Sequence, residues 1–563
     1  MYPWIQTFSD RSVTELEYRH GFLNNPKRTP SFFFFRDKNY DDEQLKLQPG
    51  EERKYKSETE NAGLLLKNLK DEVLKSDTIV YNDYPAPSFL AEKLYDELDE
   101  FFSKLFEKRR HLSQMDIENL NHEAFISSQP LDEIFLDEDN NISIMNDFIE
   151  STGSNGFYSG EALLVTGSMG TGKTTLLANW CHQFIQNKQN KRKETDLFVY
   201  HFVGCSPDSL NYVSILRRCV THFQERLGVV HKVENNAKEL LKELIILLNQ
   251  ARKKKWRTIL VIDGLNSLTY QDGLELMRWF PETIFSNAKV ILSTTGSDDA
   301  GFFNTLTTER KCQMISLNPL TPQTQEHIID KLLEARGKRL SSLQRLRFLS
   351  HPQAENALCL RILTEELCFH GKYETLDSVI ESYLESQDIE QIFMKIIDRM
   401  EKDYSNSKPD IVGKIFKCVY SAREGLTDFE LAEMLNLHLS DFAVIYYAMA
   451  DYMRSNSGII TFRYKQLREA IRKRYFSSPQ EEIEAASFLA DFFFQKLKEC
   501  ENSDFEVDDA SALRLINELP WLLTKVEKFQ ELQEFLIHPY VINQLLRVQN
   551  FPKLIYFWNM TNV

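Results

Sequence analysis

The chain has 563 residues, which corresponds to about three or four folded units at roughly 150 residues per domain. Its 67 Lys and Arg residues against 83 Asp and Glu residues give a net charge of −16, which argues against nucleic acid as a partner. Hydrophobic residues make up 42% and charged residues 27%, with only 20 Gly and 17 Pro, so disorder and turn-rich β folds are disfavoured.

The cysteines and the N-terminus indicate the compartment. The eight cysteines are scattered without a CxxC pair, and a chain this long needs no disulfides, so we interpret them as reduced thiols. The start, MYPWIQTFSDR, lacks the basic and apolar regions of a signal peptide, and no run approaches the ~18 apolar residues of a membrane span. These features predict a cytoplasmic protein without membrane contact.

Residues 1–110 predict an incomplete strand–helix unit. The run Phe32–Phe35 and the segment TIVYNDY at 78–84 are typical of buried strands, and Phe89–Arg110 carries a helical apolar stripe. A parallel sheet normally has about five strands, so we expect strands to be missing from this partial Rossmann-like unit. Residues 111–155, rich in Asn, Asp, Glu and Ser, predict a linker with one short helix.

Residues 156–318 predict an α/β core. Short apolar runs alternate there with helical patterns, as is typical of a parallel sheet with helices on both faces. The four predicted strands are ALLVT at 162–166, LFVYHFV at 197–203, TILVID at 258–263 and KVILSTT at 289–295.

The strands stop after Pro319, and the rest of the chain is predicted to be mostly helical. Residues 319–410 show amphipathic helices. Residues 411–478 predict a helix in LTDFELAEML, a helix over 444–454 and a short hairpin strand after residue 457, an order that resembles a winged-helix domain. Residues 479–563 are predicted to be all helix, separated by Pro520, Pro539 and Pro552.

One motif carries clear chemistry. Residues 167–174, GSMGTGKT, fit the phosphate-loop pattern G-x-x-x-x-G-K-[ST] between a predicted strand and a helix that begins near Lys173. Glycines let main-chain amides surround a phosphate that a Cβ would displace. We expect Lys173 to reach the β- and γ-phosphates and Thr174 to bind Mg²⁺. The predicted nucleotide cradle comprises Gly167, Ser168, Met169, Gly170, Thr171, Gly172, Lys173, Thr174 and Thr175.

Asp263, at the end of strand 258–263, is the candidate carboxylate for Mg²⁺, the alternative being an aspartate that caps the next helix. Lys173 and Asp263 would then be the catalytic residues of any hydrolysis. Asn266 stands where a following acid would polarise water, and it cannot act as a base. We therefore expect slow hydrolysis with stable nucleotide binding. The sequence shows no NKxD segment, which favours ATP or ADP over guanine nucleotides.

Two weaker signals have alternative interpretations. Ser293, Thr294 and Thr295 end a predicted strand and would either sense a γ-phosphate or simply satisfy the strand terminus. The basic run 252–255 with Arg257 predicts a solvated helix end in preference to a nucleic-acid patch.

On these residues, the chain resembles a STAND-class P-loop NTPase of the NACHT type, most like the nephrocystin and telomerase-associated-protein group. The resemblance implies a TIR-related domain at the start, a helical lid, a winged helix and a helical stretch that leads into tetratricopeptide repeats. It also implies a switch in which ADP holds a closed form and ATP favours an open, assembling form. The segments that carry it are TELEYRHGFLNNP, LLVTGSMGTGKTTLLANW, LVIDGLNSL, AENALCLRILTEEL, GIITFRYKQLREAIRKRY and LRLINELPWLLTKVEKFQELQEFL.

The chain departs from this group at several nucleotide contacts. Asn266 and Ser267 occupy positions where the group often has further acids. Ala357 replaces a proline that typically packs on adenine, and Tyr464 replaces a histidine that often contacts the ADP phosphates. Gly296 lies near the place of a missing arginine. The first half of the N-terminal domain and all repeats are also missing from the pattern, so we expect a short isoform, a fragment or a degenerate paralogue.

Three functions compete. The first is a slow, nucleotide-dependent switch for protein assembly that binds ATP or ADP with Mg²⁺. The second is an interaction scaffold with a vestigial nucleotide site. A metabolic phosphotransferase is the weakest, because neither a substrate hydroxyl site nor a base is identifiable. Family analogy adds protein partners at the C-terminal helices, self-assembly in an activated form and association with cilia.

Overall fold

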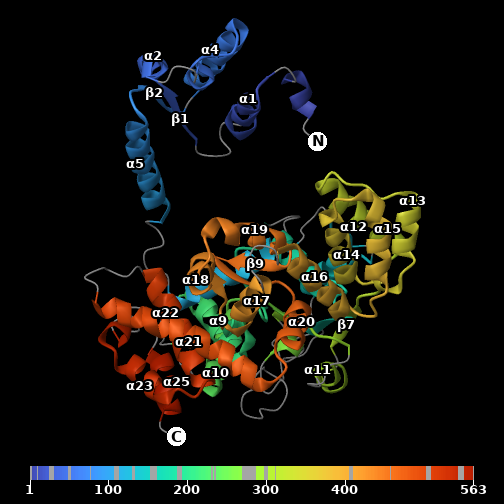
Figure 1. The fold of residues 1–563 in the computed structure, drawn as a ribbon. Helices are drawn as coiled ribbons and strands as arrows, with labels where there is room; N and C mark the ends of the chain where they lie inside the picture. The colour runs from blue at the N-terminus through green and yellow to red at the C-terminus, as the bar shows by residue number, and fades with distance from the viewer. Residues whose placement is uncertain are drawn as a thin grey trace. The chain divides into compact units, whose positions relative to one another are not determined.

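The computed structural model describes residues 3–8, 11–24, 31–47, 52–76, 78–106, 113–129, 134–137, 139–151, 162–186, 193–229, 233, 236–268, 287–296, 302–310, 312–404, 410–456, 458–502, 509–542 and 551–561. The chain divides into two compact units, Met1–Leu112 and Ser113–Val563 (Figure 1). The finer domain boundaries given above remain predictions.

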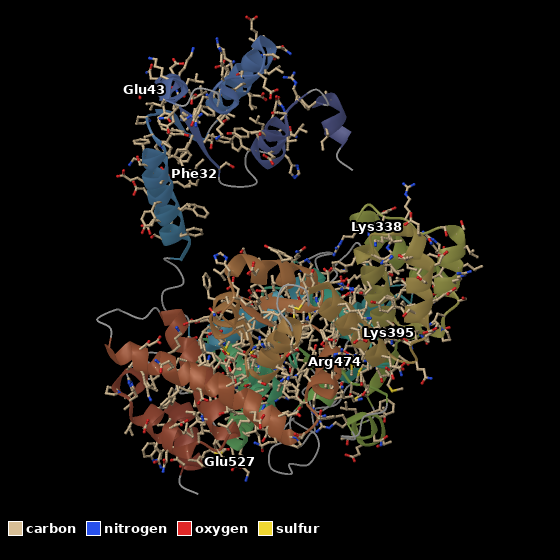
Figure 2. All side chains as sticks on the ribbon, viewed as in Figure 1. Phe32, Glu43, Lys338, Lys395, Arg474 and Glu527 are labelled. Atoms are coloured by element: carbon tan, nitrogen blue, oxygen red, sulfur yellow. The ribbon has the colours of Figure 1, made fainter. Side chains whose placement is uncertain are left out.

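The first unit contains two parallel strands, β1 (Phe32–Arg36) and β2 (Ile79–Tyr84), as the sequence predicts. Among the described residues no further strand joins them. Figure 2 labels Phe32 at the start of β1, where alternate side chains, Phe33 and Phe35, pack with Val73 in a small core. The helices are η1 (Pro3–Phe8), α1 (Val13–Tyr18), η2 (Arg19–Leu23), α2 (Lys38–Leu47), α3 (Glu52–Tyr55), α4 (Glu60–Leu74) and α5 (Pro87–Phe106).

A five-stranded parallel sheet forms the centre of the second unit. Its order is β4-β5-β6-β3-β7, so the strand before the phosphate loop, β3, is separated from β5 by β6. The strands are β3 (Ala162–Thr166), β4 (Asp196–Phe202), β5 (Arg257–Asp263), β6 (Ala288–Ser293) and β7 (Gln313–Ser316). The four predicted strands are confirmed to within two residues. The edge strand β7 was not predicted, because only Ile315 of its four residues is buried.

Helices cover both faces of this sheet. The strands alternate their side chains, so Leu163 and Val165 of β3 enter one core while Leu164 enters the other. The first core receives α8 (Lys173–Ile185), and the second receives α9 (Tyr212–Leu227) and α10 (Ala237–Lys253). Short segments complete this part: η5 (Asp208–Leu210), η6 (Leu265–Ser267), α11 (Phe302–Asn304) and η7 (Thr305–Glu309).

The predicted linker with one short helix is wrong. Residues 111–155 contain two helices, α6 (Gln114–Ser127) and α7 (Asn141–Glu150). Ile126 of α6 and Met145 of α7 are buried in the same core as α8, because the polar residues of this segment lie between apolar ones at helical spacing. These helices are therefore part of the second unit's core.

Helices follow the sheet, as predicted. We name α12–α16 the lid helices: α12 (Pro322–Ala335), α13 (Ser342–Leu349), α14 (Ala357–Phe369), α15 (Tyr373–Leu384) and α16 (Ile389–Tyr404), with η8 (Pro352–Glu355) before α14. Four of them, α12 to α15, gather on one side of this unit in Figure 1.

A three-stranded antiparallel sheet, ordered β8-β10-β9, marks residues 411–475, which we name the hairpin unit. The helix predicted over 444–454 ends at Met449, because Met453 and its neighbours pair with β10 instead. The two-residue strand β8 was too short to predict. The elements are α17 (Ile411–Ser421), β8 (Leu426–Thr427), α18 (Asp428–Met434), α19 (Leu439–Met449), β9 (Met453–Asn456), β10 (Ile459–Phe462) and α20 (Lys465–Tyr475). Arg474, labelled in Figure 2, joins α20 to Asp398 of α16 at 2.6 Å.

The C-terminal part is helical, as predicted: α21 (Pro479–Asn502), α22 (Asp509–Lys525), α23 (Phe529–Ile537) and α25 (Phe551–Met560). Pro520 lies inside α22 and does not separate two helices. Burial of Leu519 and Leu522 beside it offsets the helix-breaking cost of about 3 kcal/mol. Across the described residues, no helix has both the length and the apolar character to span a bilayer.

Candidate functional site

The phosphate loop, Gly167–Thr174, joins the end of β3 to the first turn of α8. Gly170 and Gly172 have φ values of +83° and +99°, a region that side chains with a Cβ rarely adopt. The loop therefore has the strand–turn–helix form that the motif requires, and α8 begins at Lys173 as predicted.

Lys173 is held inside this loop by main-chain carbonyls. Its Nζ donates to Gly167 O at 2.8 Å and to Ser168 O at 2.7 Å. Burial lowers the pKa of Lys173, and the charge of Asp263 partly opposes that shift. The ammonium group is thus poised among weak neutral acceptors, which an anionic phosphate can replace.

The side chains of Thr174 and Asp263 meet, as the sequence predicts. Thr174 Oγ1 donates to Asp263 Oδ2 at 2.8 Å, across a separation of 89 residues. Ser293, at the end of β6, donates to Asp263 Oδ1 at 2.5 Å and accepts from Gly264 N at 2.8 Å. Ser293 therefore satisfies and orients the carboxylate, in agreement with the strand-terminus interpretation.

Burial also affects the ionisation of Asp263. Asp263 is only 3% exposed, and burial raises the pKa of its carboxyl. The hydrogen bonds from Ser293 and Thr174 and the charge of Lys173 oppose this shift. Burial thus disfavours the ionised form of this carboxyl, and a cation beside it would relieve that cost.

The donor set suits Mg²⁺. A threonine hydroxyl and a carboxylate are hard oxygen ligands, and Mg²⁺ prefers such oxygens at about 2.1 Å in octahedral geometry. Adjacent ligand oxygens then lie about 3 Å apart, close to the 2.8 Å between Thr174 Oγ1 and Asp263 Oδ2. When bound with nucleotide, the ion would neutralise phosphate charge at these two residues.

The lid helices reach the phosphate loop through a residue that the sequence did not single out. Asn356, at the N-terminus of α14, donates from Nδ2 to Met169 O at 2.8 Å. The main-chain N–H of Leu358 donates to Gly170 O at 3.1 Å. These contacts join residues 187 and 188 positions apart, and no local sequence pattern predicts them.

The departures from related sequences also have places in the structure. Asn266 and Ser267 form the short turn η6 after Asp263. Ala357 is the first residue of α14, next to the phosphate loop. Tyr464 lies at the start of α20, and its Oη is buried without a hydrogen-bond partner among the described side chains. Gly296 lies close to Thr166, whose Oγ1 would be 3.6 Å from an added Cβ.

The basic run predicted as a helix end does lie at one. Arg252 and Lys253 are in the last turn of α10, and Lys254 Nζ donates to Leu227 O at 3.1 Å. Arg257 binds Asp196 through two hydrogen bonds of 2.9 and 2.7 Å. These residues serve helix termination and strand pairing.

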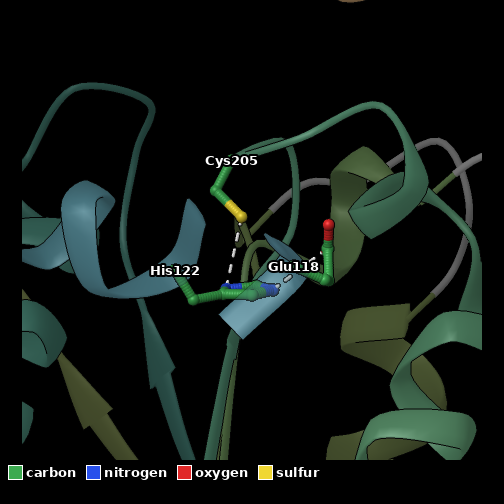
Figure 3. A group of neighbouring side chains, drawn as sticks. All are labelled: Glu118, His122 and Cys205. Carbon is green, nitrogen blue, oxygen red and sulfur yellow. Dashed lines mark hydrogen bonds and ion pairs between the residues drawn. The ribbon is translucent and has the colours of Figure 1, made fainter. Parts of the chain in front are cut away.

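A buried group of possible metal ligands lies elsewhere, between α6 and the end of β4. Figure 3 shows the imidazole of His122 between Cys205 and Glu118, with Sγ 3.2 Å from Nδ1 and Oε1 3.4 Å from Nε2. However, Nδ1 already accepts the main-chain N–H of Phe202 at 3.1 Å, which leaves the proton on Nε2. Neither ring nitrogen then offers a free lone pair, so we interpret the group as a hydrogen-bonded junction of α6 with the sheet.

Sequence comparisons agree with this site. Residues 161–336 match the NACHT domain family model. A TPR repeat-containing protein of Dictyostelium discoideum is 24% identical over 99% of this chain and 36% of its own length. Telomerase protein component 1 of Mus musculus is 24% identical over 50% of this chain and 11% of its own. Nephrocystin-3 of Homo sapiens is 22% identical over 70% of this chain and 29% of its own.

The parallel sheet, the phosphate loop and the Thr174–Asp263 pair define the class of P-loop NTPases. Within that class the chain carries a NACHT domain, and TPR-repeat proteins, nephrocystin-3 and telomerase protein component 1 are its distant homologues. It spans about a third or less of the length of these relatives. Their whole-protein activities and partners are therefore not carried over to it.

Proposed function

We propose that this protein binds ATP or ADP with Mg²⁺ in the phosphate loop and acts as a slow nucleotide-dependent switch for protein assembly. The observation that carries the proposal is the arrangement around Lys173. Its ammonium rests on two loop carbonyls while Thr174 and Asp263 meet beside it. The side chains that would hold the phosphates and Mg²⁺ thus lie together at the start of α8, which supports the proposal.

Slow hydrolysis of the bound nucleotide is expected from the residues that follow Asp263. The turn η6 offers Asn266 and Ser267, and neither can take a proton from an attacking water at neutral pH. Asp263 itself is occupied by Thr174 and Ser293. A switch requires only that two nucleotides favour two conformations unequally, so turnover need not be fast.

A two-state element is available in the docking of the hairpin unit on the sheet. Arg423 pairs with Asp208 at 2.7 Å, and Arg454 donates to Cys205 O at 3.0 Å. Arg463 donates to Ser128 O of α6 at 2.9 Å. These contacts between described residues are polar, and the apolar clusters of the hairpin unit and of the sheet are separate. A difference in nucleotide binding energy is therefore able to shift this docking.

Protein partners at the C-terminal helices fit the exposed apolar side chains of α25, where Ile555, Tyr556 and Trp558 are 58%, 45% and 41% exposed. A cytoplasmic setting fits the seven cysteines that the structure describes, all of which carry free thiols.

The test measures nucleotide affinity together with the radius of gyration of the protein. Fluorescent ADP and ATP analogues are titrated with Mg²⁺ into wild type and Lys173→Ala, and small-angle scattering follows each wild-type complex. We expect Lys173-dependent binding and a larger radius of gyration with the ATP analogue than with ADP. Equal affinity in both proteins refutes nucleotide binding at this loop. Binding without any difference in shape refutes the switch.

An interaction scaffold with a vestigial site is the second candidate, favoured by the departures at Asn266, Ala357 and Tyr464. Among the described residues, the buried hydroxyl of Tyr464 has no hydrogen-bond partner. Mass spectrometry of the purified protein separates the two functions, because co-purifying ADP contradicts a vestigial site.

A further inference from the structure

The side chain of Asn356 has two tasks at once. Its Oδ1 accepts the main-chain N–H groups of Leu358 and Cys359, at 3.1 and 3.2 Å, and so caps α14. Its Nδ2 donates to Met169 O in the phosphate loop at 2.8 Å. One amide group therefore links the start of a lid helix to the tip of the phosphate loop.

Asn356 and Leu358 together decide which way two loop amides point. In a planar trans peptide, the C=O and the following N–H point in opposite directions. Met169 O and Gly170 O are both drawn outward, by Asn356 Nδ2 and by Leu358 N. The N–H groups of Gly170 and Thr171 must then face the inside of the loop. The Thr171 N–H indeed points across the loop to Ser168 O, at 3.4 Å.

The approach of Asn356 is close enough to require glycine. A Cβ added at Gly170 would lie 2.5 Å from Asn356 Oδ1 and 3.0 Å from Nδ2. The glycine at this position of the motif therefore serves the lid contact as well as the turn, and the contact is tightly packed.

We propose that Asn356 is a positioning residue for nucleotide binding: by holding the carbonyl of Met169 toward the lid, it pre-organises the N–H of Gly170 for a phosphate. The main-chain N–H of Leu358, in the helix start that Asn356 caps, holds Gly170 O in the same way and so orients the N–H of Thr171. The lid and the phosphate affinity are thereby coupled, because any movement of α14 withdraws both donors. This inference rests on the proposed function, since it presumes that the loop binds a nucleotide.

The test uses variants that separate the two tasks of the side chain. Asn356→Ser and Asn356→Asp keep an oxygen to cap α14 but remove the amide Nδ2 that donates to Met169 O. Asn356→Ala removes both. Asn236 caps α10 in the same way, by accepting Lys238 N at 2.8 Å, and the hydrogen bonds of Asn236 among the described residues, from Lys238 N and Leu240 N, lie within α10. Asn236→Ser and Asn236→Asp are therefore matched controls.

Mg·ADP affinity is measured by fluorescence titration, and hydrogen exchange follows the amides of residues 168–172. For both Asn356→Ser and Asn356→Asp we expect about fivefold weaker ADP binding and faster exchange in the loop, with a melting temperature close to that of wild type. The two Asn236 variants should bind as wild type does.

Two results overturn the inference. If the serine and aspartate variants restore the affinity that Asn356→Ala loses, the residue acts only as a helix cap. If only the aspartate variant weakens binding, the cause is charge repulsion and not the lost donor. In both cases wild type still binds ADP in a Lys173-dependent way. A wild type that binds no nucleotide instead refutes the proposed function itself.

Discussion

The phosphate loop and the junction around Glu366 differ in how their charged side chains are hydrogen-bonded. At the junction, the carboxylate of Glu366 accepts four hydrogen bonds: from Arg399 Nε and Nη2, both at 2.8 Å, from Tyr383 Oη at 2.6 Å and from Tyr452 Oη. At the loop, the hydrogen-bond acceptors of Lys173 among the described residues are two neutral carbonyls.

The difference distinguishes a junction whose hydrogen bonds stabilise the fold from a loop whose hydrogen bonds a ligand can replace. Glu366 joins three lid helices to Tyr452 of the hairpin unit, and each lone pair has a donor, so any movement there leaves a buried charge unsatisfied. A phosphate, by contrast, offers Lys173 a better partner than the carbonyls do. Substitution at the junction should therefore affect folding, and substitution at the loop should affect binding.

The largest effect is expected at the junction. Glu366→Ala leaves Arg399 and two tyrosines without their shared acceptor, and we expect a loss of about 3 kcal/mol in the free energy of unfolding. Glu381→Ala is the control, because the Arg347–Glu381 pair is exposed, with side chains 43% and 64% accessible. That variant should lose less than about 0.5 kcal/mol. Urea unfolding measures both, and similar losses would remove the contrast.

Next in size is Lys173→Ala. We expect a roughly 30- to 100-fold loss of ADP affinity, because a charge-assisted contact to the phosphates disappears, with little change in the free energy of unfolding. Lys254→Ala removes a comparable lysine-to-carbonyl bond, to Leu227 O, and should bind ADP as wild type does. Calorimetric titration measures the affinities, and a strongly destabilised Lys173→Ala protein would contradict the account.

Asp263→Asn should separate stability from function. The pKa of Asp263 is raised in the folded protein, so as pH rises above the ordinary value of 3.8 the unfolded chain ionises first and folding becomes less favourable. The penalty is complete above the folded pKa and absent below 3.8.

The asparagine variant carries no such penalty, so its stability relative to wild type should increase as pH rises from about 4 to about 7.5. Its Mg²⁺-dependent ADP affinity should fall about tenfold. Urea unfolding across this pH range and titrations with and without Mg²⁺ give the two measurements. A relative stability that decreases with rising pH would show that the carboxylate is not penalised.

The smallest effect is expected for Ala357→Pro. Ala357 is the first residue of α14, where proline is favoured, and Asn356 before it is extended, with φ −94° and ψ 120°, as the residue before proline must be. We expect about 0.5 kcal/mol of added stability and unchanged or slightly tighter ADP binding. Thermal unfolding checks this, and a clear loss of stability would show that the start of α14 cannot accept proline.

Short-range sequence patterns predicted the elements that depend mainly on their own residues. Continuous apolar runs identified β3, β4, β5 and β6, because strands buried on both faces must be apolar throughout. The same rule overlooked β7, whose Met314 is 52% exposed at the edge of the sheet. The helical pattern in turn extended a predicted helix to residue 454, because an apolar stripe does not reveal that Met453 pairs with a later strand.

The site was predictable to the same degree. Lys173, Thr174 and Asp263 were found because the phosphate-binding chemistry fixes their types and places at strand ends. Asn356 was not found, since its role depends on a contact with Met169 that only the packing of the lid helices creates. Ser293 was noticed, but which group it satisfies became clear only from the strand order, which places β6 beside β5.

The central claim is that the phosphate loop holds an adenine nucleotide. The most direct measurement is mass spectrometry of nucleotide extracted from purified wild type and Lys173→Ala, followed by calorimetric titration of Mg·ADP into the nucleotide-free proteins. The account predicts ADP or ATP in wild type, much less in the variant, and Lys173-dependent rebinding. Wild type that carries no nucleotide and takes up none at millimolar ADP would contradict it.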